Sequence, residues 1–162
     1  MVVLTLLLFL EVFYQELVET VPGSQQRRNK MEVIRQERGW AGHFICADRC
    51  LFRRNTLLTC GNIQIVISTV GLMENPPELV KERPDLFQRF STIGYNRYYE
   101  TMAFHADPND TRYHDIDVTR QVSFDSPWAI SELDADDKAN EMHEQVVKEI
   151  TEGLQRGKTY ED

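Results

Sequence analysis

The feature that most limits the fold of this chain is a helical run of apolar residues near its C-terminus. Six apolar residues recur every three or four positions, namely Ala135, Ala139, Met142, Val146, Ile150 and Leu154. This spacing gives a helix one apolar stripe, and such a stripe needs an apolar surface to cover. Ser131 is expected to cap the start of the helix and Gly157 its end. The rest of the chain must therefore provide an element with an apolar face.

The residues before this helix show the patterns of strands. His114–Phe124 alternates between apolar and polar residues, which is typical of a strand with one buried face. Leu51–Cys60 and Ile63–Val70 flank Gly61-Asn62, a dipeptide typical of a hairpin turn. Two more strands are expected, at Trp40–Cys46 and Tyr98–His105. The sequence thus predicts one α+β domain, in which an antiparallel sheet of about four to five strands packs against the long C-terminal amphipathic helix.

Residues 1–30 precede this domain, and several interpretations of them stay open. Residues 2–21 begin with an apolar run, but Glu11 lies in its middle and no basic residue precedes it. These features disfavour both a membrane span and a signal peptide. Arg27, Arg28 and Lys30 would nevertheless suit the cytoplasmic flank of a membrane anchor. The leading hypothesis is that translation starts at Met31, so that residues 1–30 come from an upstream start codon and residues 31–162 form the single domain.

The charge of the chain is unevenly distributed. From Asp125 onward there are 11 acids and 4 bases, a net charge of −7 out of the total of −8. Residues 27–54 have the opposite bias, with 8 bases and 3 acids. We therefore expect a bipolar molecule. The total of −8 also disfavours nucleic-acid binding without a partner.

Histidines and carboxylates gather around a predicted turn after the strand Tyr98–His105. His105, His114, Asp115 and Asp117 combine the residue types that bind divalent cations and support hydrolysis. The same types are common in turns, where they bind the local backbone. A metal-assisted hydrolase or nuclease using these four residues is therefore an alternative hypothesis, and no cofactor is predicted.

A second group of potential ligands is His43, Cys46 and Cys50. Their side chains suit zinc, but the spacing lacks the paired short intervals of a zinc site. Three cysteines in the whole chain are too few for a disulfide framework, which favours reduced thiols in a cytoplasm. Buried, unreactive cysteines are the alternative interpretation.

The absence of a catalytic motif and the segregation of charge favour a non-enzymatic binding or accessory protein that acts through a protein partner. The candidate interaction surface consists of Arg49, Arg53, Arg54, Glu141, Glu144 and Glu152. One of the two adjacent arginines is also expected to pair with an acid of the C-terminal helix. A membrane-tethered domain, anchored by residues 2–21, is a further alternative.

Several segments resemble small proteins encoded by phages and mobile elements of gut bacteria. The resemblance is carried by RGWAGHFICADRCLFRRNTLL, IVISTVGLM, GYNRYYETMAFHA and SPWAISELDADDKANEMHE, and it covers about residues 35–155. It implies a cytoplasmic bacterial setting and agrees with a start at Met31. It implies no fold, catalytic residue or cofactor.

Overall fold

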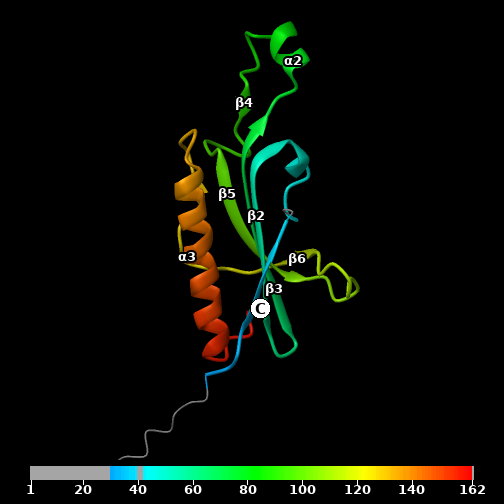
Figure 1. Ribbon diagram of the computed structural model, residues 1–162, viewed down its shortest axis with the longest axis vertical. Coiled ribbons are helices and arrows are strands. Elements are labelled where there is room, and N and C mark those ends of the chain that lie inside the picture. The colour runs from blue at the N-terminus through cyan, green and yellow to red at the C-terminus, as the bar shows by residue number, and fades with distance from the viewer. Residues whose placement is uncertain (1–29, 40–41, 162) are drawn as a thin grey trace, which may run out of the picture. The chain divides into compact units, whose positions relative to one another are not determined.

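The computed structural model describes residues 30–39 and 42–161. From Met31 onward these residues form one compact unit. An antiparallel sheet lies at its centre, and a long helix packs along one face of the sheet (Figure 1). The predicted α+β fold is therefore confirmed.

Five strands follow one another in the sheet in the order β1-β2-β3-β5-β6, while the short strands β4 and β7 pair with β3 and β5. The strands are β1 (Ile34–Arg38), β2 (Cys50–Cys60), β3 (Ile63–Glu74), β4 (Phe90–Ser91), β5 (Tyr99–Ala106), β6 (Ile116–Gln121) and β7 (Ala129–Ile130). The helices are the short 3-10 turn η1 (Ala47–Arg49), α2 (Pro77–Glu82) and α3 (Asp136–Gln155).

The hairpin of β2 and β3 turns at Gly61-Asn62, as predicted. Gly61 has a φ of 59°, a conformation that glycine adopts without steric cost. The pairing is unbroken from Phe52 to Cys60, so residues opposite each other there share a face of the sheet. On the face toward α3, Phe52 lies opposite Gly71, which lies opposite Tyr99. Because Gly71 has no side chain, the two rings meet above it with centroids 5.7 Å apart.

The apolar stripe of α3 is buried against the sheet, as its spacing predicts. Val146, Ile150 and Leu154 pack with Ile67 and Ala103 in the larger core cluster. Ala135, Ala139 and Met142 join Phe52 and Tyr99 in a second cluster.

Gly157 ends α3 with a φ of 89°. Its N–H donates to the carbonyl of Leu154, and the Lys158 N–H donates to that of Gly153. This pair of bonds satisfies the last turn of the helix.

The predicted cap at Ser131 is wrong, because α3 begins five residues later. Asp134 has a φ of 51°, which interrupts any helix before Ala135. The start is organised instead by the Tyr99 hydroxyl, which accepts from the Ala135 N–H and donates to Asp136 Oδ1 at 2.7 Å. A strand side chain thus replaces the expected local cap.

The face of the sheet away from α3 is partly covered by residues 42–49, which we call the strap. Gly42 donates its N–H to Ser68 Oγ, and the ring of His43 stacks on Phe104. Figure 1 shows α3 and the strap on opposite sides of the sheet. The strand predicted at Trp40–Cys46 is wrong for residues 42–46, which form bends and a turn, while residues 40–41 lie outside the described residues.

Strand β6 is shorter than the predicted His114–Phe124, and the expected apolar face is broken. Val118 is 69% exposed, whereas Val122, beyond the end of the strand, is buried. Asp117 Oδ1 accepts from the N–H and the hydroxyl of Thr119. Such local bonds compete with regular strand pairing.

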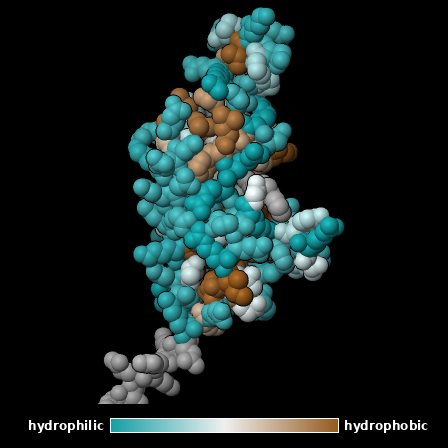
Figure 2. All heavy atoms as spheres, in the orientation of Figure 1, coloured by the Kyte–Doolittle hydropathy of each residue, from teal (hydrophilic) through white to brown (hydrophobic). Residues whose placement is uncertain are grey.

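Residues 76–98, which we call the arm, extend from the sheet between β3 and β5 and contain α2 and β4 (Figure 1). Its base is held by buried Asn75, whose Nδ2 donates to the Gln88 carbonyl and Ser91 Oγ. No residue of α2 is buried. Figure 2 shows a mostly hydrophilic surface, with hydrophobic residues gathered near the end of the sheet from which the arm leaves.

Candidate functional site

In the histidine and aspartate group predicted as a catalytic alternative, Asp117 and the neighbouring Asp110 accept hydrogen bonds from the local backbone. Asp110 accepts from the N–H groups of Arg112, Tyr113 and Asp115, and these bonds lower its pKa. The bonds from Thr119 lower the pKa of Asp117 in the same way. These contacts are the turn chemistry that the sequence also suggested.

The other members of this group are dispersed. Asp115 Oδ1 accepts from the N–H of Ile116, and His114 has a φ of 51° in the loop. His105 is buried on the α3 face, where its Nε2 donates to the Tyr160 carbonyl at 2.9 Å.

His43, Cys46 and Cys50 are likewise not arranged as ligands. The Cys50 thiol is bonded to the Cys46 carbonyl at 3.8 Å, and burial raises its pKa to about 11. His43 points to Phe104 and Glu100 on the sheet. Within residues 30–39 and 42–161, no three His, Cys, Asp or Glu side chains are placed to hold a metal ion.

The six residues of the predicted interaction surface do not lie together, although Arg54 and Glu144 contact each other. Arg54 pairs with Glu144 at 2.7 Å, the kind of strand-to-helix contact expected for one of the two arginines. Arg49 binds the base of the arm through Glu74 O and Asn75 Oδ1. Arg53 is exposed on the opposite face of the sheet from Arg54.

On α3, Glu141 is exposed and Glu152 pairs with Arg156 at 3.7 Å. These acids and the three arginines therefore do not form one continuous patch.

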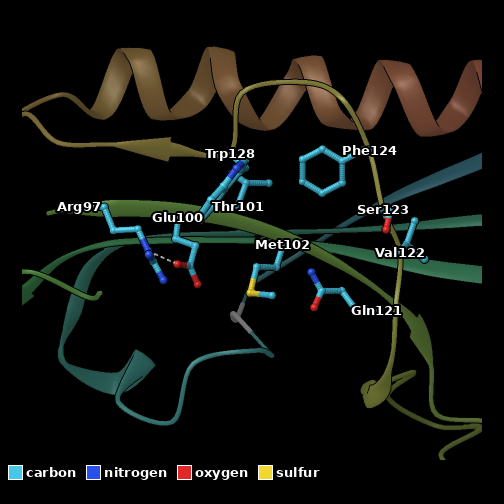
Figure 3. Close-up of a pocket in the computed structure, with 9 residues that line it drawn as sticks. All are labelled: Arg97, Glu100, Thr101, Met102, Gln121, Val122, Ser123, Phe124 and Trp128. Carbon is cyan, nitrogen blue, oxygen red and sulfur yellow. Dashed lines mark ion pairs between the residues drawn. The ribbon is translucent and has the colours of Figure 1, made fainter. Parts of the chain in front are cut away.

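A different candidate site is an opening along the outer edge of β5. This edge pairs with β7 at Tyr99 and Glu100, and with β6 only from Phe104 onward. The Val122 N–H donates to the Ala103 carbonyl and the Thr101 N–H donates to the Trp128 carbonyl, so the chain leaves the strand only between Val122 and Trp128. The resulting pocket has a volume of about 310 Å³ and is lined by Arg97, Glu100, Thr101, Met102, Gln121, Val122, Ser123, Phe124 and Trp128 (Figure 3).

The segment that arches over the opening is held by α3. Glu149 accepts from the N–H groups of Asp125 and Ser126 and from the Ser126 hydroxyl, at 2.6–2.9 Å. Burial alone would raise the pKa of Glu149, but these donors outweigh burial and lower it. Hydrogen bonds to α3 thus hold the outer wall of the opening in place.

Two basic side chains, Arg97 and His43, meet at Glu100. Arg97 Nε is ion-paired with Glu100 Oε2, and His43 Nε2 lies 3.5 Å from Glu100 Oε1. Burial would raise the pKa of Glu100, yet His43 and Arg97 together hold it below its ordinary value. Arg97 also stacks on Trp128, with the guanidinium carbon 5.1 Å from the ring centroid. In Figure 3 the side chains of Arg97 and Glu100 point toward each other beside this ring.

His43 itself is incompletely satisfied. Its side chain is 2% exposed, and neither ring nitrogen makes a hydrogen bond within the described part of the chain. Buried polar groups usually have partners, and exceptions concentrate at functional sites or at bound water. The neighbourhood of Glu100 is therefore the strongest candidate site in the molecule.

A chain of hydrogen bonds leads from the pocket through the core. It begins at Thr101, which lines the pocket and is hydrogen-bonded to Thr69, and Thr69 is in turn hydrogen-bonded to His143 Nδ1. On the other side of the ring, His143 Nε2 is hydrogen-bonded to Thr56, and Thr56 to Glu37. All four distances are 2.7–3.0 Å.

The direction of each bond follows from its two ends. A carboxylate only accepts, so Thr56 donates to Glu37 and accepts from His143 Nε2–H. Burial, and then the positive charge of Arg54, lower the pKa of His143 to about 4, so the ring is neutral and its Nδ1 accepts. Thr69 therefore donates to Nδ1 and accepts from Thr101. We call this directed set the relay.

Sequence reasoning missed Arg97, Glu100 and Trp128. They are brought together by pairing between β5 and β7, which no local spacing reveals. The one signal was a charged residue, Glu100, inside the aromatic and apolar strand Tyr98–His105. A charge at such a position usually has a specific partner.

The chain has no match among protein-family models, curated proteins or solved structures. No helix in the described ranges is long and apolar enough to cross a bilayer. The anchor hypothesis concerns residues 2–21, which lie outside the described residues.

Proposed function

We propose that the protein is a non-enzymatic binding module that acts through a protein partner, docked over the opening beside β5. The observation that carries this proposal is the rim of the opening. Arg97 and Trp128 stack there, and Tyr95, two residues from Arg97, is 96% exposed. Arginine, tryptophan and tyrosine are the residue types that dominate binding free energy at protein interfaces.

The strap adds apolar surface near the same site. Ile45 is 97% exposed and lies two residues from His43, which contacts Glu100. Leu51, two residues before Arg53 on β2, is 55% exposed. Covering such side chains contributes roughly 25 cal/mol of binding free energy per Å² of apolar area, and this favours the docking of a partner here. Arg53 is thus the one arginine of the predicted surface that this proposal retains.

Site-specific photocrosslinking in cells that naturally make the protein tests this function. A benzophenone amino acid at Tyr95 or Ile45 should give one discrete crosslinked product that contains another protein. The same probe at Gln145, which is exposed on α3, is the matched control and should give none. Equal products at all three positions, or none at Tyr95 and Ile45, would contradict the proposal.

A further inference from the structure

We infer that the partner enters the opening with a carboxylate group, which the guanidinium of Arg97 binds. This inference rests on the proposed function and adds the chemistry of the anchor. The site is formed by Arg97 with Gln121 and Ser123 around the pocket, and Trp128 and Met102 supply its apolar walls.

The guanidinium of Arg97 is held in place before any ligand arrives. Its Nε is ion-paired with Glu100, and one contact is with the ring of Trp128. A further contact is with Gly94, where an added Cβ would overlap the guanidinium carbon. An arginine restrained in this way loses little conformational entropy on binding, which favours affinity.

The terminal nitrogens of Arg97 are available as donors. Neither terminal nitrogen makes a hydrogen bond to any residue of the ranges 30–39 and 42–161, and the side chain is 26% exposed. Two parallel N–H groups of a guanidinium match the two oxygens of a carboxylate. The free face of Arg97 therefore fits an acidic ligand.

The carboxylate of the pocket already has two close neighbours. His43 Nε2 lies 3.5 Å from Glu100 Oε1, Arg97 Nε is ion-paired with Glu100 Oε2, and the Glu100 side chain is 9% exposed. Gln121 is exposed, and Figure 3 shows its amide pointing toward Met102. The Gln121 amide can donate or accept, whereas the positive guanidinium of Arg97 only donates, so a ligand that accepts is favoured over a cationic one.

The size of the pocket fits one residue of a peptide. Its volume of about 310 Å³ is at the lower end of ligand sites. A carboxylate on a peptide has two sources, an acidic side chain or the C-terminus. Both present the same chemistry to Arg97, so the experiment must separate them.

NMR titration of ¹⁵N-labelled full-length protein with three small probes tests the inference. N-acetyl-glutamate methylamide carries the side-chain carboxylate, N-acetyl-alanine the terminal carboxylate, and N-acetyl-glutamine methylamide neither. We expect saturable shifts of the Trp128 indole N–H and the Gln121 side-chain amide in the millimolar range with at least one carboxylate. The neutral probe should bind at least tenfold more weakly.

Two variants place the binding at Arg97. Arg97→Gln removes the guanidinium, and Gly94→Ala keeps it but displaces it, so each should weaken carboxylate binding at least tenfold. Arg89→Gln is the matched control. Arg89 also has a carboxylate on Nε, from Glu74 at 2.9 Å, and a ring beneath it, Phe90, but it is 70% exposed and does not line this pocket.

The outcomes separate this inference from the proposed function. Binding of one carboxylate probe, lost in Arg97→Gln and kept in Arg89→Gln, supports the inference and identifies the source. Equal binding of the neutral probe, or unchanged binding in a folded Arg97→Gln variant, overturns it. If the carboxylate probes fail while crosslinking at Tyr95 succeeds, the anchor chemistry is wrong and the docking function stands.

Discussion

His143 lies at the centre of the relay, fully buried between α3 and the sheet. Its folded-state pKa of about 4 is below the ordinary value of about 6.5. Between these values the unfolded chain binds a proton that the folded chain excludes. The stability that this lowered pKa contributes is therefore fully present above about pH 6.5 and is lost as the pH falls toward 4.

We predict that lowering the pH from 7 to 5 reduces the free energy of unfolding by about 2 kcal/mol through His143. Urea unfolding at the two pH values measures this loss. His143→Gln should remove most of this difference. His114→Asn is the control and should keep it, because His114 lies in an exposed loop and its own φ is already positive, a conformation that asparagine tolerates. An unchanged pH dependence in His143→Gln would show that another group is responsible.

Gly71 is the residue on which the contact of Phe52 and Tyr99 depends. A Cβ at this position would overlap the ring of Tyr99. We predict that Gly71→Ala lowers the free energy of unfolding by roughly 1–3 kcal/mol, the usual cost of overpacking. Chemical denaturation checks this value against Gly39→Ala, where an added Cβ meets nothing within 4 Å. Equal stability of the two variants would contradict the prediction.

Among the elements, the link between α3 and the arch depends on Glu149. Hydrogen bonds to a charged group contribute about 1.5–3 kcal/mol, more than most surface ion pairs. We predict that Glu149→Gln destabilises the protein by at least 1 kcal/mol and speeds hydrogen exchange at the Asp125 and Ser126 amides. Glu152→Gln, which removes only an exposed ion pair with Arg156, should change neither quantity. Exchange rates that stay at the wild-type level in Glu149→Gln would contradict this role.

The sequence predicted elements where one local rule dominates. Gly61-Asn62 located the hairpin, and the stripe from Ala135 to Leu154 located the helix with its buried side. Strand β1 was missed because IRQER has no apolar alternation, being exposed on most of its length at the edge of the sheet. The strand at Trp40–Cys46 was predicted from apolar composition, yet Ile45 is 97% exposed. Composition does not distinguish a strand from a loop that presents apolar residues.

The candidate site was beyond prediction for a different reason. Its members come from the strap, the turn before β5, β5 itself and the segment before β7, and only the pairing of distant segments joins them. The histidines and aspartates of the predicted catalytic group are close in sequence. They are close because turns commonly contain such residues, which bind the local backbone.

At the scale of the whole molecule, the acidic charge of the C-terminal region is largely engaged in the structure. Eight acids lie between Glu132 and Glu152. Five of them contact other groups, namely Glu132, Asp136, Glu144, Glu149 and Glu152. The expected acidic surface is therefore smaller than the formal charge implies, and Glu144 in particular joins β1 to α3 through Arg35.

We predict that Glu144→Gln lowers the free energy of unfolding by about 1 kcal/mol, because it disconnects Arg35 and Arg54 from α3. The loss should be greater at low salt than in 1 M NaCl, since salt screens exposed charges. Glu141→Gln, one turn earlier and exposed, is the control and should leave stability within about 0.5 kcal/mol. Thermal or urea unfolding at both salt concentrations provides the measurement. A loss in Glu144→Gln no larger than that in Glu141→Gln would contradict it.

The position of α3 in the chain has a consequence for the protein while it is being made. The face that α3 covers consists of β2, β3 and β5, all of which leave the ribosome before it. Translation adds about 5–20 residues per second. Until α3 emerges, Leu58, Ile67 and Ala103 have no cover from the helix, and Thr56 and Thr69 lack the imidazole between them. We therefore expect the nascent sheet to bind chaperones that recognise apolar surface, and a ribosome that stalls before residue 136 to leave that surface uncovered.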